Sequence, residues 1–237
     1  MLPKSQQIQE EEYFLPYHWS FDRATYGGRI YFGYLDICLS FLDKSKVIKV
    51  LDAGCGDGRF LSLLKDRGIQ EVYGVDYSER AVSFAQILVP TAKVSVENLM
   101  NLPYENFFDV IFLIEVLEHI DPKDTGKLLN SLKKSLKSSG ELIISTPSVN
   151  IIPPEKHFQH FSEKSIRDII EPYFEVIEIK GQGRLGPSFL GFLYKFLDNR
   201  YWLLRKIAKY YNLYIWPKYF NVCDVTKGQR IIARCGK

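Results

Sequence analysis

The chain has 237 residues, of which 46% are apolar and 25% charged, and its formal net charge is +3. This composition excludes a disordered or collagen-like chain, and so small a charge does not by itself predict nucleic-acid binding. None of the four cysteines belongs to a C-x-x-C pair, so the sequence predicts neither a disulfide framework nor a zinc knuckle.

Residues 1–46 form the first stretch and are rich in aromatic side chains. Glu10–Glu12 stand where a secretion signal needs an apolar core, and no apolar run approaches the ~20 residues of a membrane span, so we expect a cytoplasmic protein. The string Glu12–Trp19 contains aromatic residues with polar tips. It is typical of a lid over a small molecule, or of a plug at the exposed edge of a sheet.

A helix is predicted at 29–42, and we expect Tyr26, Gly27 and Gly28 to form a hinge before it. With this helix, residues 1–46 make up a predicted N-terminal lid.

From residue 47 onward, strand-like and helix-like stretches alternate. Apolar runs predict seven strands, at 47–53, 71–76, 92–96, 107–114, 138–147, 174–181 and 229–235. Amphipathic stretches predict helices at 59–68, 78–89, 124–136 and 162–174. Strands separated by helices pair in parallel, so we expect the α/β class with a doubly wound, seven-stranded, mostly parallel, Rossmann-like sheet.

Three parts follow from this pattern. Residues 1–46 precede the sheet domain, which takes residues 47–181 together with 228–237. Residues 182–227 form an α-helical insert between the last two strands, rich in aromatic and basic side chains.

The most informative stretch is Val50–Arg59, VLDAGCGDGR. A predicted strand ends near Asp52, and Gly54, Gly56 and Gly58 follow at alternate positions. Glycine permits positive φ and lets a ligand contact the backbone, and the helix that follows favours negative groups at its N-terminus. A G-x-G-x-G spacing by itself also fits a dinucleotide site.

Three further motifs follow in order. Asp76 ends the second predicted strand, where an acid accepts hydrogen bonds from ribose hydroxyls. The sequence SVENLMNLP at 95–103 follows the third strand. The sequence FDVIFLIEVLEHI at 108–120 covers the fourth strand and its end.

Taken in order, these four motifs resemble those of class I S-adenosylmethionine (SAM)-dependent methyltransferases, of the ubiquinone-pathway O-methyltransferase and methyltransferase-11 and -23 types. The resemblance covers roughly residues 47–181 and 229–235. It implies SAM as the cofactor and S-adenosylhomocysteine as the product. It implies that Asp52, Gly54 and Gly56 hold the methionine end, that Asp76 takes the ribose, and that Tyr77 packs beside the adenine. Many members have aspartate where this chain has Asn98, whose amide oxygen can accept the same bond from the adenine amino group. The other residues expected at the cofactor are Cys55, Leu99 and Ile114.

Transfer of a methyl group to a hydroxyl needs a base, and histidine is the usual one near neutral pH. His119, His157 and His160 follow predicted strands four and five, at the sheet edge where ligands bind. We expect His119 to be the base, with His157, His160 and His18 as alternates, and Tyr17 to orient the acceptor. The alternative for each histidine is a hydrogen bond to loop backbone.

The sequence also allows a metal site. Glu115, Glu118 and His119, with His157 or His160, would offer oxygen and nitrogen ligands for Mg²⁺, Mn²⁺ or Zn²⁺. The E-x-x-E-H pattern looks like the metal site of Hen-type small-RNA 2′-O-methyltransferases and is similar to the ubiquinone-pathway enzymes. The same pattern is common where no metal is expected, so Glu118 orienting the loop and His119 lining the pocket is the competing interpretation.

The stretch 185–220 holds twelve aromatic residues and six basic residues against one acid. One interpretation is a helical cap that shapes an apolar acceptor pocket, or a dimer surface. The others are peripheral contact with an anionic membrane and RNA binding by stacking.

The sequence thus predicts a SAM-dependent methyltransferase for a small or medium-sized acceptor, methylated at oxygen. Aromatic lids suggest a ring-bearing, lipid-like or glycoside acceptor. The alternatives are a metal-assisted RNA 2′-O-methyltransferase, against which the small charge counts, and a non-catalytic SAM-binding module. The oligomeric state stays open.

Overall fold

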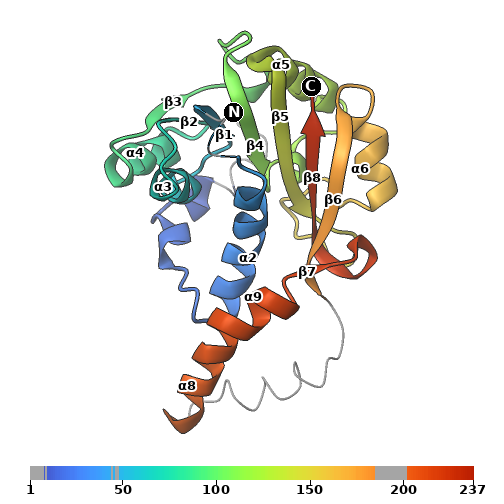
Figure 1. Ribbon diagram of the computed structural model, residues 1–237. Coiled ribbons are helices and arrows are strands. Elements are labelled where there is room, and N and C mark those ends of the chain that lie inside the picture. Colours follow the sequence, from blue (N-terminus) through green and yellow to red (C-terminus); the bar gives the residue numbers. More distant parts are fainter. Residues whose placement is uncertain (1–7, 9, 44, 46–47, 185–201) are drawn as a thin grey trace.

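The structure is a computed structural model that describes residues 8, 10–43, 45, 48–184 and 202–237. Within these residues one sheet runs in the order β3-β2-β1-β4-β5-β8-β6-β7 (Figure 1). Its strands are β1 (Lys49–Ala53), β2 (Glu71–Asp76), β3 (Lys93–Val96), β4 (Phe108–Ile114), β5 (Leu136–Pro147), β6 (Glu175–Arg184), β7 (Val222–Cys223) and β8 (Gly228–Gly236). The first five pair in parallel, and β8 lies antiparallel between β5 and β6.

The α/β class and the mostly parallel sheet are therefore confirmed, but the predicted number of seven strands is wrong. The described residues form eight strands, because Val222 and Cys223 pair with Gln182 and Gly181 at the end of β6. Two residues are too few to give a periodic pattern, so β7 had no signal of its own in the sequence.

Helices cover both faces of the sheet. α2 (Tyr26–Ser40), α3 (Arg59–Asp66) and α4 (Glu79–Leu88) pack on one face, and α5 (Thr125–Ser135) and α6 (Glu163–Ile170) on the other (Figure 1). Successive strand side chains point to opposite faces. Val50 of β1 accordingly packs with α2 and α3, whereas Leu51 packs in the cluster that holds α5 and α6. Both faces of the sheet are covered by a buried apolar cluster, as the continuous apolar runs of the strands predict.

The predicted hinge before the first long helix is wrong. Gly27 and Gly28 lie in the first turn of α2, and the Thr25 side chain caps that helix by accepting a hydrogen bond from Gly28 N at 3.0 Å. A Cβ on Gly28 would lie 1.7 Å from the carbonyl oxygen of Asp22. Gly28 therefore permits the tight turn by which residues 22–25 lead into α2.

The described part of the insert continues from α8 (Trp202–Tyr210) through a π-helical turn, η4 (Tyr211–Ile215), into α9 (Trp216–Tyr219) (Figure 1). η4 and α9 lie against α2, and Asn212 of η4 accepts a 2.7 Å hydrogen bond from Arg29 of α2. The predictions for 185–201 lie outside the described residues. No helix in the described part of the chain is long and apolar enough to cross a membrane.

Candidate functional site

A glycine loop follows β1. Gly54 and Cys55 donate backbone hydrogen bonds of 2.8 and 3.0 Å to the carbonyl of Val75, and Gly56 N donates to Asp76 Oδ2 at 2.9 Å. Gly54 has a φ of +87°, and a Cβ there would lie 2.4 Å from Cγ2 of Val116. Both the backbone conformation and the space therefore require glycine at this position.

Above this loop lies a cavity of about 590 Å³, a size typical of small-molecule sites. It opens at the carboxyl ends of the parallel strands, as expected for a doubly wound sheet. All nine residues that the sequence assigns to the cofactor line this cavity: Asp52, Gly54, Cys55, Gly56, Asp76, Tyr77, Asn98, Leu99 and Ile114.

Two carboxyl groups beneath the cavity are almost fully buried. Asp52 is 2% exposed, and burial together with the carboxylate of Asp76 raises the pKa of Asp52 to about 8. Burial also raises the pKa of Asp76, while the N–H groups of Ser78 and Gly56 oppose that shift. A positively charged ligand would favour the ionised form of both groups. Asp52 fits the ammonium group at the methionine end of SAM, and Asp76 fits the ribose hydroxyls.

Asn98 has a structural bond as well as a place in the cavity. Its Oδ1 accepts a 2.9 Å hydrogen bond from Met100 N and caps the short helix η2 (Leu99–Asn101). Such an amide oxygen has a second lone pair, so the expected bond from an adenine amino group remains compatible with the cap.

The N-terminal segment is bound to the glycine loop through Asp57, a residue the sequence analysis missed. Asp57 is fully buried, and its carboxylate accepts a 3.0 Å hydrogen bond from His18 N and lies 3.1 Å from His18 Nδ1. Trp19 Nε1 donates to the Asp57 carbonyl at 3.0 Å. The position of Asp57 between two motif glycines was the available signal.

Tyr13 belongs to the predicted lid string, but the sequence predicted no role for it at the cofactor loop. It is 3% exposed, and a Cβ added to Gly56 would lie 2.5 Å from its hydroxyl. The Glu12 carboxylate next to it accepts hydrogen bonds of 2.6 and 2.8 Å from Lys156 Nζ. Residues 12–19, called the strap below, therefore connect the glycine loop with the loop between β5 and α6.

Three histidines converge at this second loop. His119 belongs to the short helix η3 (Leu117–His119) after β4, and its Nδ1 lies 3.3 Å from the Lys156 carbonyl. His157 Nδ1 lies 2.9 Å from His160 Nε2, and His160 Nδ1 lies 3.0 Å from the Ile151 carbonyl. His119, His157, His18 and Tyr17 line the cavity, but His160 lies behind His157, outside the lining residues of the described chain.

The hydrogen bonds assign the tautomers of these rings. A carbonyl only accepts, so the Nδ1 atoms of His119 and His160 carry protons. His160 then accepts at Nε2 from His157 Nδ1–H. His119 and His157 are both left with a lone pair on Nε2.

Burial keeps His119 and His157 neutral. It lowers the pKa of His119, with a further contribution from the nearby ammonium of Lys156. Burial, followed by the neighbouring His119 and His160, lowers the pKa of His157 to about 3. Both rings are therefore uncharged at neutral pH.

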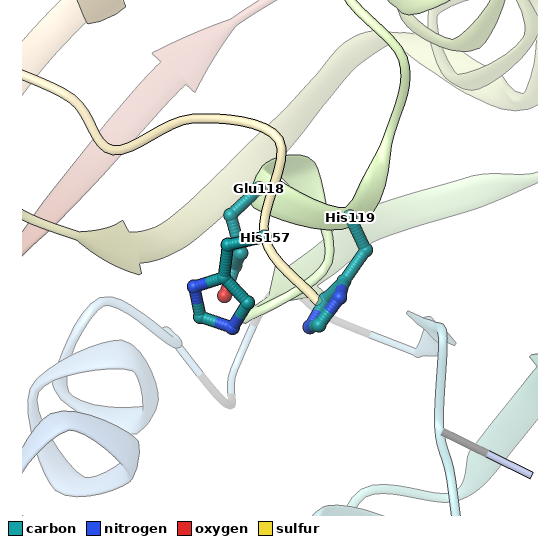
Figure 2. A group of neighbouring side chains, drawn as sticks. All are labelled: Glu118, His119 and His157. Carbon is teal, nitrogen blue, oxygen red and sulfur yellow. The ribbon is translucent and has the colours of Figure 1, made fainter. Parts of the chain in front are cut away.

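The two glutamates of the E-x-x-E-H pattern separate. Glu115, at a strained φ of +54°, accepts 2.8 Å hydrogen bonds from Arg230 Nε and Ser145 Oγ. Glu118 is 1% exposed and points toward His119 and His157 (Figure 2). One ligand atom from each of these three residues lies within 4.8 Å of the others. Glu115 lies outside this group of three, and its carboxylate is bound by Arg230 and Ser145.

Residues 29–212 match the model of a methyltransferase domain family. The chain belongs to this methyltransferase family. A probable S-adenosylmethionine-dependent methyltransferase of Mycolicibacterium smegmatis is 27% identical over 141 residues, which cover 56% of this chain and 54% of that protein. The mitochondrial ubiquinone biosynthesis O-methyltransferase of Dictyostelium discoideum is 30% identical over 115 residues, covering 42% of this chain and 35% of that protein.

A solved SAM-dependent methyltransferase of Archaeoglobus fulgidus shares the fold, with a TM-score of 0.61, 20% identity, and coverage of 88% of this chain and 94% of that one. This chain spans only 45% to 66% of the length of the first curated relatives that it matches. Family membership makes SAM the cofactor of this methyltransferase domain. The glycine loop and the buried carboxyl groups fit that cofactor.

Proposed function

We propose that this methyltransferase transfers the methyl group of SAM to an oxygen of a small or medium-sized, ring-bearing or lipid-like acceptor. The observation that carries the proposal is the placement of the His119 and His157 Nε2 lone pairs in the same cavity as the glycine loop. Bound SAM supplies an activated methyl group, and the chain's own residues align and activate the acceptor.

His119 is the group that activates the acceptor hydroxyl. Its Nε2 lone pair can act directly, by accepting the hydroxyl proton, or through a cation that it holds. The pKa of His157, about 3, makes that ring too weak a base for direct action. His160 positions His157, since it lies behind that ring and fixes its tautomer.

The other acceptor contacts come from the strap and α2. Burial, and then the Glu12 carboxylate, raise the pKa of Tyr17, so its phenol stays protonated and can donate a hydrogen bond to the acceptor. Apolar and aromatic side chains line this side of the cavity and suit a ring or a lipid-like chain: Phe21, Tyr26, Ile30, Tyr31, Tyr34 and Leu35.

The charge of the cavity favours a small acceptor over RNA. Its lining includes six acidic residues, Asp52, Asp57, Asp76, Glu97, Glu115 and Glu118, against the cations Arg59, Lys156 and Arg230. Burial raises the pKa of Asp52, Asp76 and Glu118, and even with these three protonated the lining formed by the described residues has no excess of cations. Phosphate backbones need an excess of cations. None of the described insert residues, 202–227, lines the cavity, so membrane contact or dimerisation through 185–220 stays a prediction.

The test is methyl transfer from radiolabelled SAM to a panel of phenols, hydroxylated lipids, glycosides and matched amines. We expect labelled methyl ethers. His119→Gln should lower kcat by about 100-fold or more, the typical contribution of acid–base catalysis, while the Kd for SAM stays within about twofold. Label on amines alone would contradict oxygen transfer. Unchanged turnover in His119→Gln would reject His119, and SAM binding without any transfer would favour a binding module.

A further inference from the structure

The strongest unassigned feature of the cavity is the cluster of Glu118, His119 and His157 (Figure 2). We propose that these three residues bind one divalent transition metal ion of the Zn²⁺ class, with an open coordination position toward the acceptor side of the cavity. This deepens the proposed function, on which it rests only for the place of the acceptor.

The two imidazoles are prepared to act as ligands. A metal binds a neutral ring nitrogen, and the hydrogen bonds at Nδ1 leave the lone pairs of both rings on Nε2. The rings lie edge to face, with centroids 4.6 Å apart. The two rings belong to different loops, so a shared ion would join η3 to the loop between β5 and α6.

Outer hydrogen bonds hold the ligands in place, as they do in established metal sites. His160 accepts from His157 and is itself fixed by the Ile151 carbonyl. The Lys156 carbonyl holds His119, and Thr146 Oγ1 donates to Glu118 Oε2 at 3.3 Å. Each ligand therefore has a partner that restricts its orientation.

The donor set decides the class of metal. Two nitrogens and one carboxylate are typical of catalytic zinc sites and of other borderline transition metals. Mg²⁺ prefers an all-oxygen environment in octahedral geometry. Glu115, which would add a second carboxylate, is bound to Arg230 at 2.8 Å. Zn²⁺ and Co²⁺ should therefore bind much more tightly than Mg²⁺.

The distances between the ligand atoms of the cluster also fit a tetrahedral metal ion. Tetrahedral ligands with bonds of about 2.0–2.2 Å lie roughly 3.3–3.6 Å apart. The ligand atoms here lie within 4.8 Å of one another, so small side-chain movements would close the site. With three protein ligands, the remaining position faces the cavity, where an acceptor oxygen can bind.

The test uses tag-free protein treated with a chelator and then titrated with Co²⁺ alone and Zn²⁺ alone. We expect one ion per chain and a visible Co²⁺ absorption spectrum of a site with low coordination number. Glu118→Gln and His157→Gln should abolish this spectrum. His160→Gln should weaken Zn²⁺ binding by roughly 10–100-fold, the usual loss for an outer hydrogen-bond partner.

Glu115→Gln is the matched control, and it should leave the Zn²⁺ affinity within about threefold. SAM binding and thermal unfolding verify that each variant folds. If Glu118→Gln fails to fold, His157→Gln, whose residue lies on a loop, tests the metal site instead. Absence of a one-to-one complex overturns the proposal. Wild-type Zn²⁺ affinity in both Glu118→Gln and His157→Gln would also overturn it. An equal loss of Zn²⁺ affinity in Glu115→Gln and Glu118→Gln would do the same.

The two proposals fail separately. Metal binding without transfer to any hydroxyl would reject the proposed function and keep the metal site. Transfer to a hydroxyl at full rate in chelated protein, with no Co²⁺ complex, would reject the metal site and keep the proposed function.

Discussion

Asp52 shows how a single buried side chain can link cofactor binding to protons. Its carboxyl lies below the glycine loop and is 2% exposed, next to Asp76, which is 5% exposed. At neutral pH the group is mostly protonated, because burial and its acidic neighbour raise its pKa to about 8. A ligand that brings positive charge must lower this pKa.

We therefore expect SAM binding near pH 7 to release a proton, and the affinity to increase as the pH rises from 6 to 8. Titration calorimetry in phosphate and in Tris should give different binding enthalpies, because the two buffers take up the proton with different heats. Asp52→Asn should remove the difference and weaken SAM binding. Equal enthalpies in both buffers for the unsubstituted protein would contradict this coupling.

The same group affects the stability of the free protein. A carboxyl whose folded pKa is raised stabilises the fold fully below its unfolded pKa, about 3.8, and this contribution is lost as the pH rises through about 8. Asp52→Asn should therefore flatten the decline of Tm over that range.

Gly54 offers a second test at the level of one residue, with Gly68 as its control. Both have positive φ, +87° and +82°, but a Cβ on Gly68 would meet no atom within 4 Å. Gly68→Ala should cost only the backbone strain, about 1–2 kcal/mol in urea unfolding. Gly54→Ala should cost more and abolish SAM binding, because its Cβ collides with Val116. Equal losses in the two variants would contradict this explanation.

At the scale of elements, the strap is held at both ends by polar contacts. Asp57 binds its His18 end, and Lys156 binds Glu12. The Lys156–Glu12 pair is partly exposed, with side chains 22% and 37% accessible, so we expect it to add less than about 1 kcal/mol to stability. Its effect should be local, since it connects two loops that border the cavity.

Hydrogen exchange tests this connection. SAM should slow exchange in residues 12–19 and 154–160 together, and Lys156→Gln should separate the two segments, so that the strap exchanges faster at unchanged Tm. The control is Lys127→Gln in α5, which breaks a 2.9 Å ion pair with Asp124 at a site outside the cavity lining. Independent protection of the segments in the unsubstituted protein would argue against the connection.

At the scale of the whole molecule, the sequence predicted what depends on local pattern. Alternation of apolar runs and amphipathic stretches placed the parallel strands and their helices, and the glycine loop was visible because three glycines follow one strand. Contacts between distant segments could not be predicted. Arg230 binds the Glu115 carboxylate although the two residues lie 115 positions apart in the sequence, and Glu115 lies outside the group of Glu118, His119 and His157.

The positions of the histidines also depend on contacts that the sequence pattern could not predict. The pattern of strands placed His119 and His157 at one edge of the sheet, but the exclusion of His160 from the cavity depends on the course of the loop at 148–161. That course is set by irregular backbone bonds, such as Phe158 N to the Glu118 carbonyl at 2.8 Å, which have no periodic signature.

The position of β8 has a consequence for biosynthesis. This strand is made after every other strand of the sheet, yet it fills the gap between β5 and β6 and carries Arg230 into the cavity. Until it leaves the ribosome, the nascent chain presents two open strand edges, which are sites for wrong pairing or for chaperones. The strands around the glycine loop can pair before β8 is made, whereas the side of the cavity that Arg230 lines is completed only when β8 inserts.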